Sequence, residues 1–209
     1  MTEHGLDFEK VRLALHGRPL LALDTRIAPG EVFSVMGPSG SGKSTLLAYA
    51  AGFLAPAFQA SGRLRLNGHD ITRVPAERRG IGLLFQDPLL FPHLSVAGNL
   101  RFGMPRRVPC KAQRIAEALS EMGLAGYGDR DPATLSGGQQ SRVALMRLLL
   151  SQPRAVLLDE PFSKLDTHLR QEMRRLVFDR LREAGLPSLL VTHDREDAEA
   201  AGGHIISLG

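Results

Sequence analysis

A glycine-rich segment at residues 37–45 has the residue types that are needed to hold a chain of phosphates. It reads Gly-Pro-Ser-Gly-Ser-Gly-Lys-Ser-Thr and fits the pattern G-x-x-x-x-G-K-S/T. Glycines let successive backbone N–H groups point into one concavity, and a following helix presents its positive end at the same place. We predict that Lys43 reaches the β- and γ-phosphates and that the Ser44 hydroxyl binds Mg²⁺. The residues predicted to contact a nucleotide here are Gly37, Pro38, Ser39, Gly40, Ser41, Gly42, Lys43, Ser44 and Thr45.

Two adjacent carboxylates, Asp159 and Glu160, follow the short apolar segment Ala155–Leu158. A carboxylate at the end of a strand next to a phosphate loop is able to hold Mg²⁺, directly or through water, and we predict this role for Asp159. We predict that Glu160 is the general base that polarises a water in line with the γ-phosphate. An Asp-Glu pair by itself is more often a solvated loop, so this prediction depends on the phosphate loop.

The sequence Leu-Ser-Gly-Gly-Gln at 135–139 is a second candidate for anion binding. We expect Ser136 and the two glycines to precede a helix that begins at Gln139, so that its N-terminus faces an anion. Helix capping by Ser136 is the alternative, but it accounts for the serine alone. The residues predicted to contact nucleotide here are Ser136, Gly137, Gly138 and Gln139.

Short apolar segments predict the parallel sheet that would position these groups. Val32–Met36 ends at Gly37, and Lys43–Ala51 has good helix formers before Gly52. The phosphate loop is therefore expected between a strand and a helix, which argues against a glycine-rich turn without a ligand. Apolar strands that alternate with helical segments are typical of a parallel sheet covered by helices. The other apolar segments are Ala155–Leu158, Ser188–Thr192 and Ile205–Leu208.

Two regions depart from this alternation near the beginning of the chain. Residues 6–31 and 62–75 contain short alternating runs of apolar and polar residues. Turn residues, such as Asn67-Gly68 within the second region, separate the alternating runs. This pattern predicts antiparallel strands at one edge of the fold. A further strand is expected at 83–85.

A third region predicts a helical insertion. Residues 111–126 have apolar positions at helical spacing, and either Gly123 or Gly126 is expected to end that helix. Together with 142–150, this segment is expected to lie between the strand at 83–85 and the apolar strand that begins at Ala155.

The phosphate loop and the LSGGQ motif together resemble those of ABC transporter nucleotide-binding subunits, and the resemblance covers nearly the whole chain. It implies an α/β fold: a P-loop NTPase (RecA-like) core with a parallel sheet, an antiparallel β edge subdomain and an inserted α-helical subdomain. It predicts one domain over 1–209, with the core and antiparallel part at about 1–86 and 151–209 and the helical subdomain at about 87–150. It also implies that the nucleotide is ATP and that Mg²⁺ is the cofactor.

The resemblance assigns roles to three further segments. Gln86 in LLFQD resembles the glutamine that links the Mg²⁺ site to membrane subunits. The segment Ser163-Lys-Leu-Asp166 resembles the loop that couples two ATP sites, so Asp166 is expected at the nucleotide. His193 in VTHD resembles the switch histidine that contacts the γ-phosphate. The predicted catalytic residues are Glu160, His193, Gln86 and Lys43, and the predicted metal ligands are Ser44, Gln86 and Asp159.

Longer segments narrow the resemblance to importers. Residues 78–100 and 159–170 are similar to ATPases that serve bacterial uptake of thiamine, iron, molybdate, sulfate or polyamines. This implies a homodimer that sandwiches ATP between Lys43 of one copy and Ser136 and Gly138 of the other. It also implies membrane permease subunits, a periplasmic solute-binding protein, and a peripheral location on the cytoplasmic face of the inner membrane. The transported substrate is not encoded here, because selectivity lies in the other subunits.

Three features depart from the family pattern. Such proteins stack adenine on an aromatic residue before the phosphate loop, whereas this chain has Leu13-Ala14-Leu15-His16, so Leu15 or His16 is expected to substitute. Lys164 stands where alanine is commoner and adds a charge at the expected dimer seam. The chain ends sixteen residues after His193, so we expect no C-terminal regulatory domain.

Composition excludes several classes of protein. The net charge is +4, but arginines are dispersed and aromatic residues are only 5% with no Trp, which argues against nucleic acid as a partner. No apolar run approaches the roughly 18–20 residues that a membrane helix needs, and the first residues do not resemble a signal peptide. The single cysteine, Cys110, fits a reducing compartment and is expected to be a surface thiol.

Other function classes fit the motifs less well. A soluble ABC ATPase that acts on DNA needs a long coiled coil, and one that acts on ribosomes carries two ATPase halves in one chain; this chain has neither. An ABC exporter or a lipoprotein-releasing ATPase remains an alternative to the importer. A GTPase needs the sequence N-K-x-D, which is missing here, and a kinase leaves LSGGQ unexplained.

Overall fold

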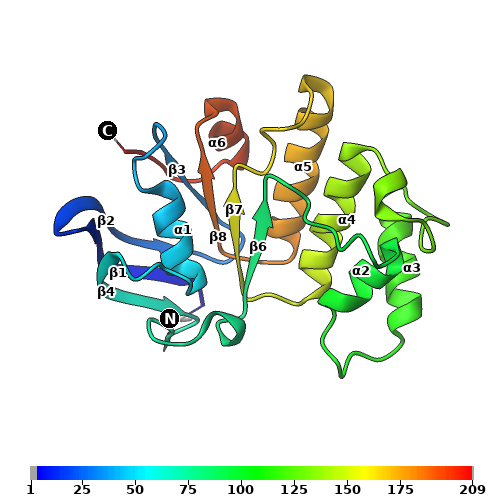
Figure 1. The fold of residues 1–209 in the computed structure, drawn as a ribbon, viewed down its shortest axis with the longest axis horizontal. Helices are drawn as coiled ribbons and strands as arrows, with labels where there is room; N and C mark the ends of the chain where they lie inside the picture. Colours follow the sequence, from blue (N-terminus) through cyan, green and yellow to red (C-terminus); the bar gives the residue numbers. More distant parts are fainter. Residues whose placement is uncertain (1–3, 209) are drawn as a thin grey trace.

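The computed structural model describes residues 4–208, which form two sheets with helices around them (Figure 1). The strands are β1 Leu6–Leu15, β2 Arg18–Ile27, β3 Val32–Met36, β4 Phe58–Leu66, β5 His69–Asp70, β6 Ile81–Phe85, β7 Ala155–Asp159, β8 Ser188–Thr192 and β9 Ile205–Ser207. The α-helices are α1 Lys43–Ala51, α2 Val96–Gly103, α3 Lys111–Glu121, α4 Gly137–Leu150, α5 Thr167–Glu183 and α6 Arg195–Ala201, with 3-10 turns at Ala76–Arg78 and Pro132–Thr134. Residues 1–3 and 209, the two ends of the predicted 1–209 domain, lie outside the described residues. The first residues of the N-terminal segment, which we predict not to be a signal peptide, are therefore not described either.

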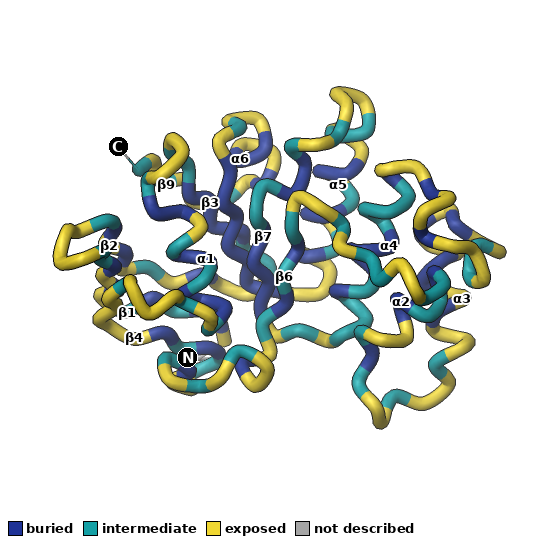
Figure 2. The backbone as a smooth tube through the Cα atoms, in the orientation of Figure 1, coloured by how far each residue is buried: buried dark blue, intermediate teal, exposed yellow. Residues whose placement is uncertain are grey.

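The predicted parallel sheet is confirmed. Its strand order is β6-β7-β8-β3-β9, and Val35 of β3 pairs with Val191 of β8. All of β8 and the first four residues of β3 and of β7 are buried, because helices cover both faces of the sheet (Figure 2). The carboxyl ends of β6, β7, β8 and β3 consequently lie side by side, and this edge is where parallel α/β sheets bind ligands.

The antiparallel sheet at one edge is also confirmed, in the order β2-β1-β4-β5. Asn67 and Gly68 have φ of 50° and 79°, which fits the tight turn between β4 and β5. However, β4 begins at Phe58, four residues before the region expected to be a strand. Residues 59–63 are exposed on both faces, so they lack the alternation of apolar and polar side chains from which a strand is predicted.

The helices α2, α3 and α4 lie between β6 and β7 in the chain and on the other side of these strands from α1 (Figure 1). The helix expected at 111–126 ends at Glu121, and Gly123 with φ +68° marks that end rather than Gly126. These helices have their own apolar cluster, which includes Val96, Leu100 and Val143. The inserted helical part is thus present; its exact boundaries stay a prediction.

The structure contains three helices that the sequence analysis did not specify, namely α2, α5 and α6. Asp166 caps α5 by accepting a hydrogen bond from Leu169 N at 3.0 Å. Asp194 caps α6 by accepting one from Glu196 N at 2.8 Å. In the described part of the chain, every helix falls short of the length and apolar content that a membrane crossing requires.

Candidate active site

The phosphate loop connects β3 to α1 as predicted. Gly42 is the N-cap of α1 with φ +93°, in the left-handed region where a side chain would be strained. No side chain caps α1 and no acidic residue lies in its first turn. The N–H groups at this helix end therefore remain available to an anion, which the helix dipole also favours.

Lys43 is buried within the phosphate loop. Its Nζ donates hydrogen bonds to the carbonyl oxygens of Gly37 at 2.7 Å and Pro38 at 2.8 Å. An ammonium group has three N–H donors, so one remains for a phosphate oxygen. The Ser41 hydroxyl is buried without a hydrogen-bond partner among the described residues, whereas buried polar groups normally have one. Both observations fit a loop that receives a phosphate.

Asp159 ends β7 beside the phosphate loop. Burial raises the pKa of its carboxyl above the usual value, the charge of Glu160 raises it further, and Lys43 opposes both. The charged form of this carboxyl is disfavoured by burial and by the neighbouring negative charge, so a bound cation would stabilise it. Within residues 4–208, no three His, Cys, Asp or Glu side chains gather as a metal site. Mg²⁺ needs only one or two carboxylates beside water and substrate phosphates, so Asp159 with the exposed Ser44 hydroxyl fits this ion.

Glu160 and His193, two predicted catalytic residues, are in direct contact. His193 Nδ1 lies 3.0 Å from Glu160 Oε1. The backbone of Glu160 has φ 44°, an uncommon conformation for a residue with a side chain, and its N–H donates to Val191 O at 2.9 Å. The sheet brings them together because Glu160 follows β7 and His193 follows β8, which are neighbours.

Gln86 follows β6 and is exposed at the same edge of the sheet. The next residue, Asp87, forms an ion pair with Lys164. The charge of Lys164, expected to lie at a dimer seam, thus has a partner in its own chain. Both side chains are more than half exposed, so this pair contributes little to stability.

The LSGGQ segment forms the beginning of α4. The helix begins at Gly137, two residues before the expected start, because Ser136 is its N-cap. Ser136 Oγ accepts from Gln139 N at 3.3 Å, and Gln139 Oε1 accepts from Ser136 N at 3.0 Å. Within residues 4–208, this capping box leaves the N–H groups of Gly137 and Gly138 without an acceptor. Capping and anion binding, weighed as alternatives, are therefore compatible.

The two anion-binding helix ends do not meet within this chain. Figure 1 shows α1 and α4 on either side of β6 and β7. Gly138 is buried against α5, since an added Cβ would lie 2.6 Å from Leu169 Cδ2, whereas Gly137 faces open space. The carboxylate of Asp166 is engaged as the cap of α5.

The β1–β2 hairpin lies next to the phosphate loop, at the expected adenine end. His16 is exposed in the hairpin turn with φ 48°, and Leu15 is half-buried. Leu20 borders the loop, because a Cβ added at Gly42 would lie 3.7 Å from Leu20 Cβ. Leu20 has no motif around it, so sequence reasoning missed it; only its position in the hairpin indicates it.

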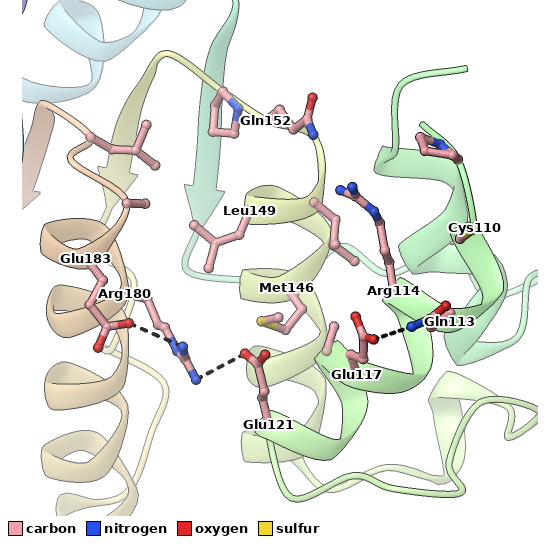
Figure 3. Close-up of a pocket in the computed structure, with 16 residues that line it drawn as sticks. Cys110, Gln113, Arg114, Glu117, Glu121, Met146, Leu149, Gln152, Arg180 and Glu183 are labelled. Atoms are coloured by element: carbon pink, nitrogen blue, oxygen red, sulfur yellow. Dashed lines mark hydrogen bonds and ion pairs between the residues drawn. The ribbon is translucent and has the colours of Figure 1, made fainter. Parts of the chain in front are cut away.

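A separate pocket of about 840 Å³ lies between α3, α4 and α5 (Figure 3). Arg180 of α5 reaches across it to Glu121 of α3 and also pairs with Glu183. None of the predicted catalytic or nucleotide-binding residues lines it. This pocket therefore belongs to the junction of the helical part with the core.

Comparison with known proteins identifies the family. The sequence model described as "ABC transporter" matches residues 20–163, more than half of the chain. The chain belongs to the ABC transporter family. Its ATP-binding role in that family accounts for the phosphate loop and the LSGGQ helix within the matched region.

Members of the ABC transporter family resemble this chain along most of its length. An uncharacterised ABC transporter ATP-binding protein, YnjD of Escherichia coli K12, is 47% identical over 185 residues, 88% of this chain and 85% of YnjD. The thiamine import ATP-binding protein ThiQ of Jannaschia sp. is 43% identical over 206 residues, 97% of this chain and 88% of ThiQ. The structure of cbiO1 from Clostridium perfringens, part of the ABC transporter complex cbiONQ, matches with a TM-score of 0.83 and 28% identity, over 97% of this chain and 84% of cbiO1.

Other ABC relatives are longer than this chain. Six that are named for import of spermidine/putrescine, Fe(3+) ions or 2-aminoethylphosphonate are 42% to 48% identical to it. This chain spans 38% to 56% of their length.

Proposed function

We propose that this chain binds and hydrolyses ATP and thereby drives solute import through a partner permease. The contact between Glu160 and His193 beside the phosphate loop carries this proposal, because it places a base and its orienting group where the γ-phosphate would lie. The import names of its relatives support the direction of transport. No feature of the described residues favours an exporter.

In this mechanism the phosphate loop and Lys43 hold the phosphates of ATP. Glu160 takes a proton from the attacking water while the new bond to the γ-phosphorus forms and the bond to the bridging oxygen of ADP breaks. His193 keeps the Glu160 carboxylate oriented. Ser44, Asp159 and Gln86 would hold Mg²⁺, which would supply positive charge to offset that of the phosphate oxygens.

The completed site requires a second copy of the chain. The free N–H groups of Gly137 and Gly138 are an anion site that the same chain does not use, since α1 lies on the other side of β6 and β7. We propose a head-to-tail dimer in which Ser136, Gly137, Gly138 and Gln139 of one copy contact the ATP held by Lys43 of the other. Asp166, at the start of α5, lies at the same seam.

An apolar groove is the proposed site for the permease. It has a volume of about 420 Å³ and lies between the end of β6, α2 and α4. Leu89 and Phe102 border it and are 57% and 66% exposed, which is unusual for large apolar side chains. The loop that lines the groove begins at Gln86. Movement of this loop at the catalytic site would therefore be transmitted to a permease helix bound in the groove. The subunit would then lie peripherally on the cytoplasmic face of the membrane, and a periplasmic solute-binding protein would deliver the substrate.

The experiment that tests the proposal uses Glu160→Gln in the full chain with Mg²⁺ and ATP. We expect the wild type to hydrolyse ATP, the variant to be at least about 100-fold slower, and only the variant to remain a dimer in light scattering with ATP. Glu77→Gln, an exposed change on the 3-10 turn, serves as the matched control. Rapid hydrolysis by Glu160→Gln, or a variant that stays monomeric with ATP, would contradict the mechanism.

A further inference from the structure

We infer that Arg170 is a positioning residue for ATP hydrolysis, and that it locks the Ser163–Asp166 loop to the loop that carries His193. This inference rests on the proposed function. Arg170 lies in the first turn of α5, and its guanidinium is partly buried between the two loops. It belongs to neither the phosphate loop nor the LSGGQ motif.

Arg170 makes hydrogen bonds to three acceptors in the two loops. Its Nη1 donates to Asp194 Oδ2 at 2.9 Å, on the loop after β8. Its Nη2 donates to Leu165 O at 3.2 Å and to Ser163 O at 3.4 Å, on the loop after β7. A planar guanidinium reaches acceptors on two sides at once, whereas a lysine ammonium offers no such fixed fork.

Both loops lead to Glu160. On one side, Ser163 Oγ donates to Glu160 O at 2.9 Å. On the other side, Asp194 directly follows His193, whose Nδ1 lies 3.0 Å from Glu160 Oε1. The residues therefore form a closed circuit from Glu160 through Ser163, Arg170, Asp194 and His193 back to Glu160. Through this circuit Arg170 restrains the geometry of the base and of its partner together.

A neighbouring arginine, Arg174, holds α5 and α6 together through ion pairs, so this packing does not depend on Arg170. Arg174, one turn along α5, is only 7% exposed and pairs with Asp197, which is 2% exposed. It also pairs with Asp194 and Glu196. Loss of Arg170 would therefore leave α5 and α6 joined through Arg174, while the tie to Ser163 and Leu165 would be lost.

The test compares Arg170→Met and Arg170→Lys with Arg182→Met, all in the full chain. Arg182 lies on the same helix, and its one ion pair within residues 4–208 is with exposed Asp179, so it is a matched control. We expect both Arg170 variants to lower kcat for ATP by about tenfold or more, with KM and melting temperature close to wild type. Arg182→Met should leave all three unchanged. Full activity of Arg170→Lys, or an equal loss in Arg182→Met, would overturn the inference.

A double-mutant cycle with His193→Ala distinguishes positioning from general damage. If Arg170 acts through the His193 loop, Arg170→Met should cause little further loss of kcat in the His193→Ala background. Independent, multiplicative losses would overturn the inference.

Hydrogen exchange tests the same inference without hydrolysis. We expect faster exchange in Arg170→Met at both 160–166 and 193–196, and no change in β8 or in Arg182→Met. Failure of wild-type hydrolysis would reject the proposed function, while unaltered exchange at either loop would reject the role of Arg170.

Discussion

Several residues at the carboxyl edge of the parallel sheet have backbone conformations or charges that lower the stability of the free protein. Glu160 has φ 44° and faces His193, and Lys43 is buried against two loop carbonyls. Asp159 is a partly buried carboxylate whose charge is opposed by its neighbour Glu160. An uncommon backbone conformation and a partly buried charge each cost free energy in the free protein, and under the proposed function a bound cation or phosphate would offset that cost.

Asp159→Asn tests this cost. The pKa of the Asp159 carboxyl is higher in the folded chain than in the unfolded chain, so the folded chain holds this proton more tightly. The protonated carboxyl therefore favours folding at pH values below the unfolded pKa, and this contribution to the free energy of unfolding is lost as the pH rises through the folded pKa. At pH 7 the variant should therefore melt about 2–4 °C higher, equivalent to about 1 kcal/mol, and lose Mg²⁺-dependent hydrolysis. At pH 3, where the carboxyl is protonated in both states, calorimetry should show no gain.

The exposed carboxylate Asp129 provides a control for this measurement. Asp129→Asn should leave the melting temperature unchanged at both pH values. A lower melting temperature for Asp159→Asn at pH 7, or a gain that persists at pH 3, would be inconsistent with an energetic cost of the charged carboxylate.

Packing between elements determines how the LSGGQ helix is presented. The buried Gly138 lets α4 approach α5 at Leu169, and Asp166 fixes the start of α5 close by. Gly137, one residue earlier, faces open space. The two glycines therefore differ in the space around their Cα atoms: Gly138 permits close packing against Leu169, whereas Gly137 has room for a side chain.

Gly138→Ala and Gly137→Ala test this difference. The added methyl at Gly138 would lie 2.6 Å from Leu169 Cδ2, so we expect a loss of about 1–3 kcal/mol in the free energy of unfolding, measured with urea. Gly137→Ala has room for its methyl and should be as stable as wild type or more so. Equal stability of the two variants would show that Leu169 yields without cost.

The molecule as a whole joins a helical part to the edge of a catalytic sheet. Arg180 pairs with Glu121 and Arg142 with Glu172, and both pairs link this part to α5. Arg147 of α4 donates to Pro88 O at 2.9 Å and Leu89 O at 2.8 Å, which supports the loop after Gln86. The apolar groove at this junction is therefore connected to both parts.

Phe102→Ser tests the groove as the permease site. We expect about tenfold weaker co-sedimentation with membranes that contain the partner permease, because a large exposed apolar contact is removed. ATP hydrolysis by the isolated subunit should persist, since Phe102 lies on α2. Ile205→Ser, at an exposed position on β9, is the control. Undiminished sedimentation of Phe102→Ser would place the permease elsewhere.

Local patterns in the sequence were sufficient to place the strands of the parallel sheet and the strand–loop–helix unit of the phosphate loop, but they missed the start of β4. β3, β7 and β8 are short apolar runs because both faces of the sheet are covered, and the phosphate loop has the glycines that its backbone requires. The helix α5 was not specified, although Met173, Val177 and Leu181 are spaced for one buried face. Its many charged residues obscured that signal.

The sequence by itself determined which residues we predict to act on phosphate. These are residues that follow recognisable strands or lie in the loops next to them: Lys43, Asp159, Glu160 and His193. Tertiary structure alone decided that Glu160 meets His193, and that Arg170 joins the loops beside them. It also decided that α1 and α4 lie on either side of β6 and β7, so the motifs read together in the sequence do not form one site in one chain. The physical reason is that strand order and helix packing, rather than spacing along the chain, determine which loop ends become neighbours.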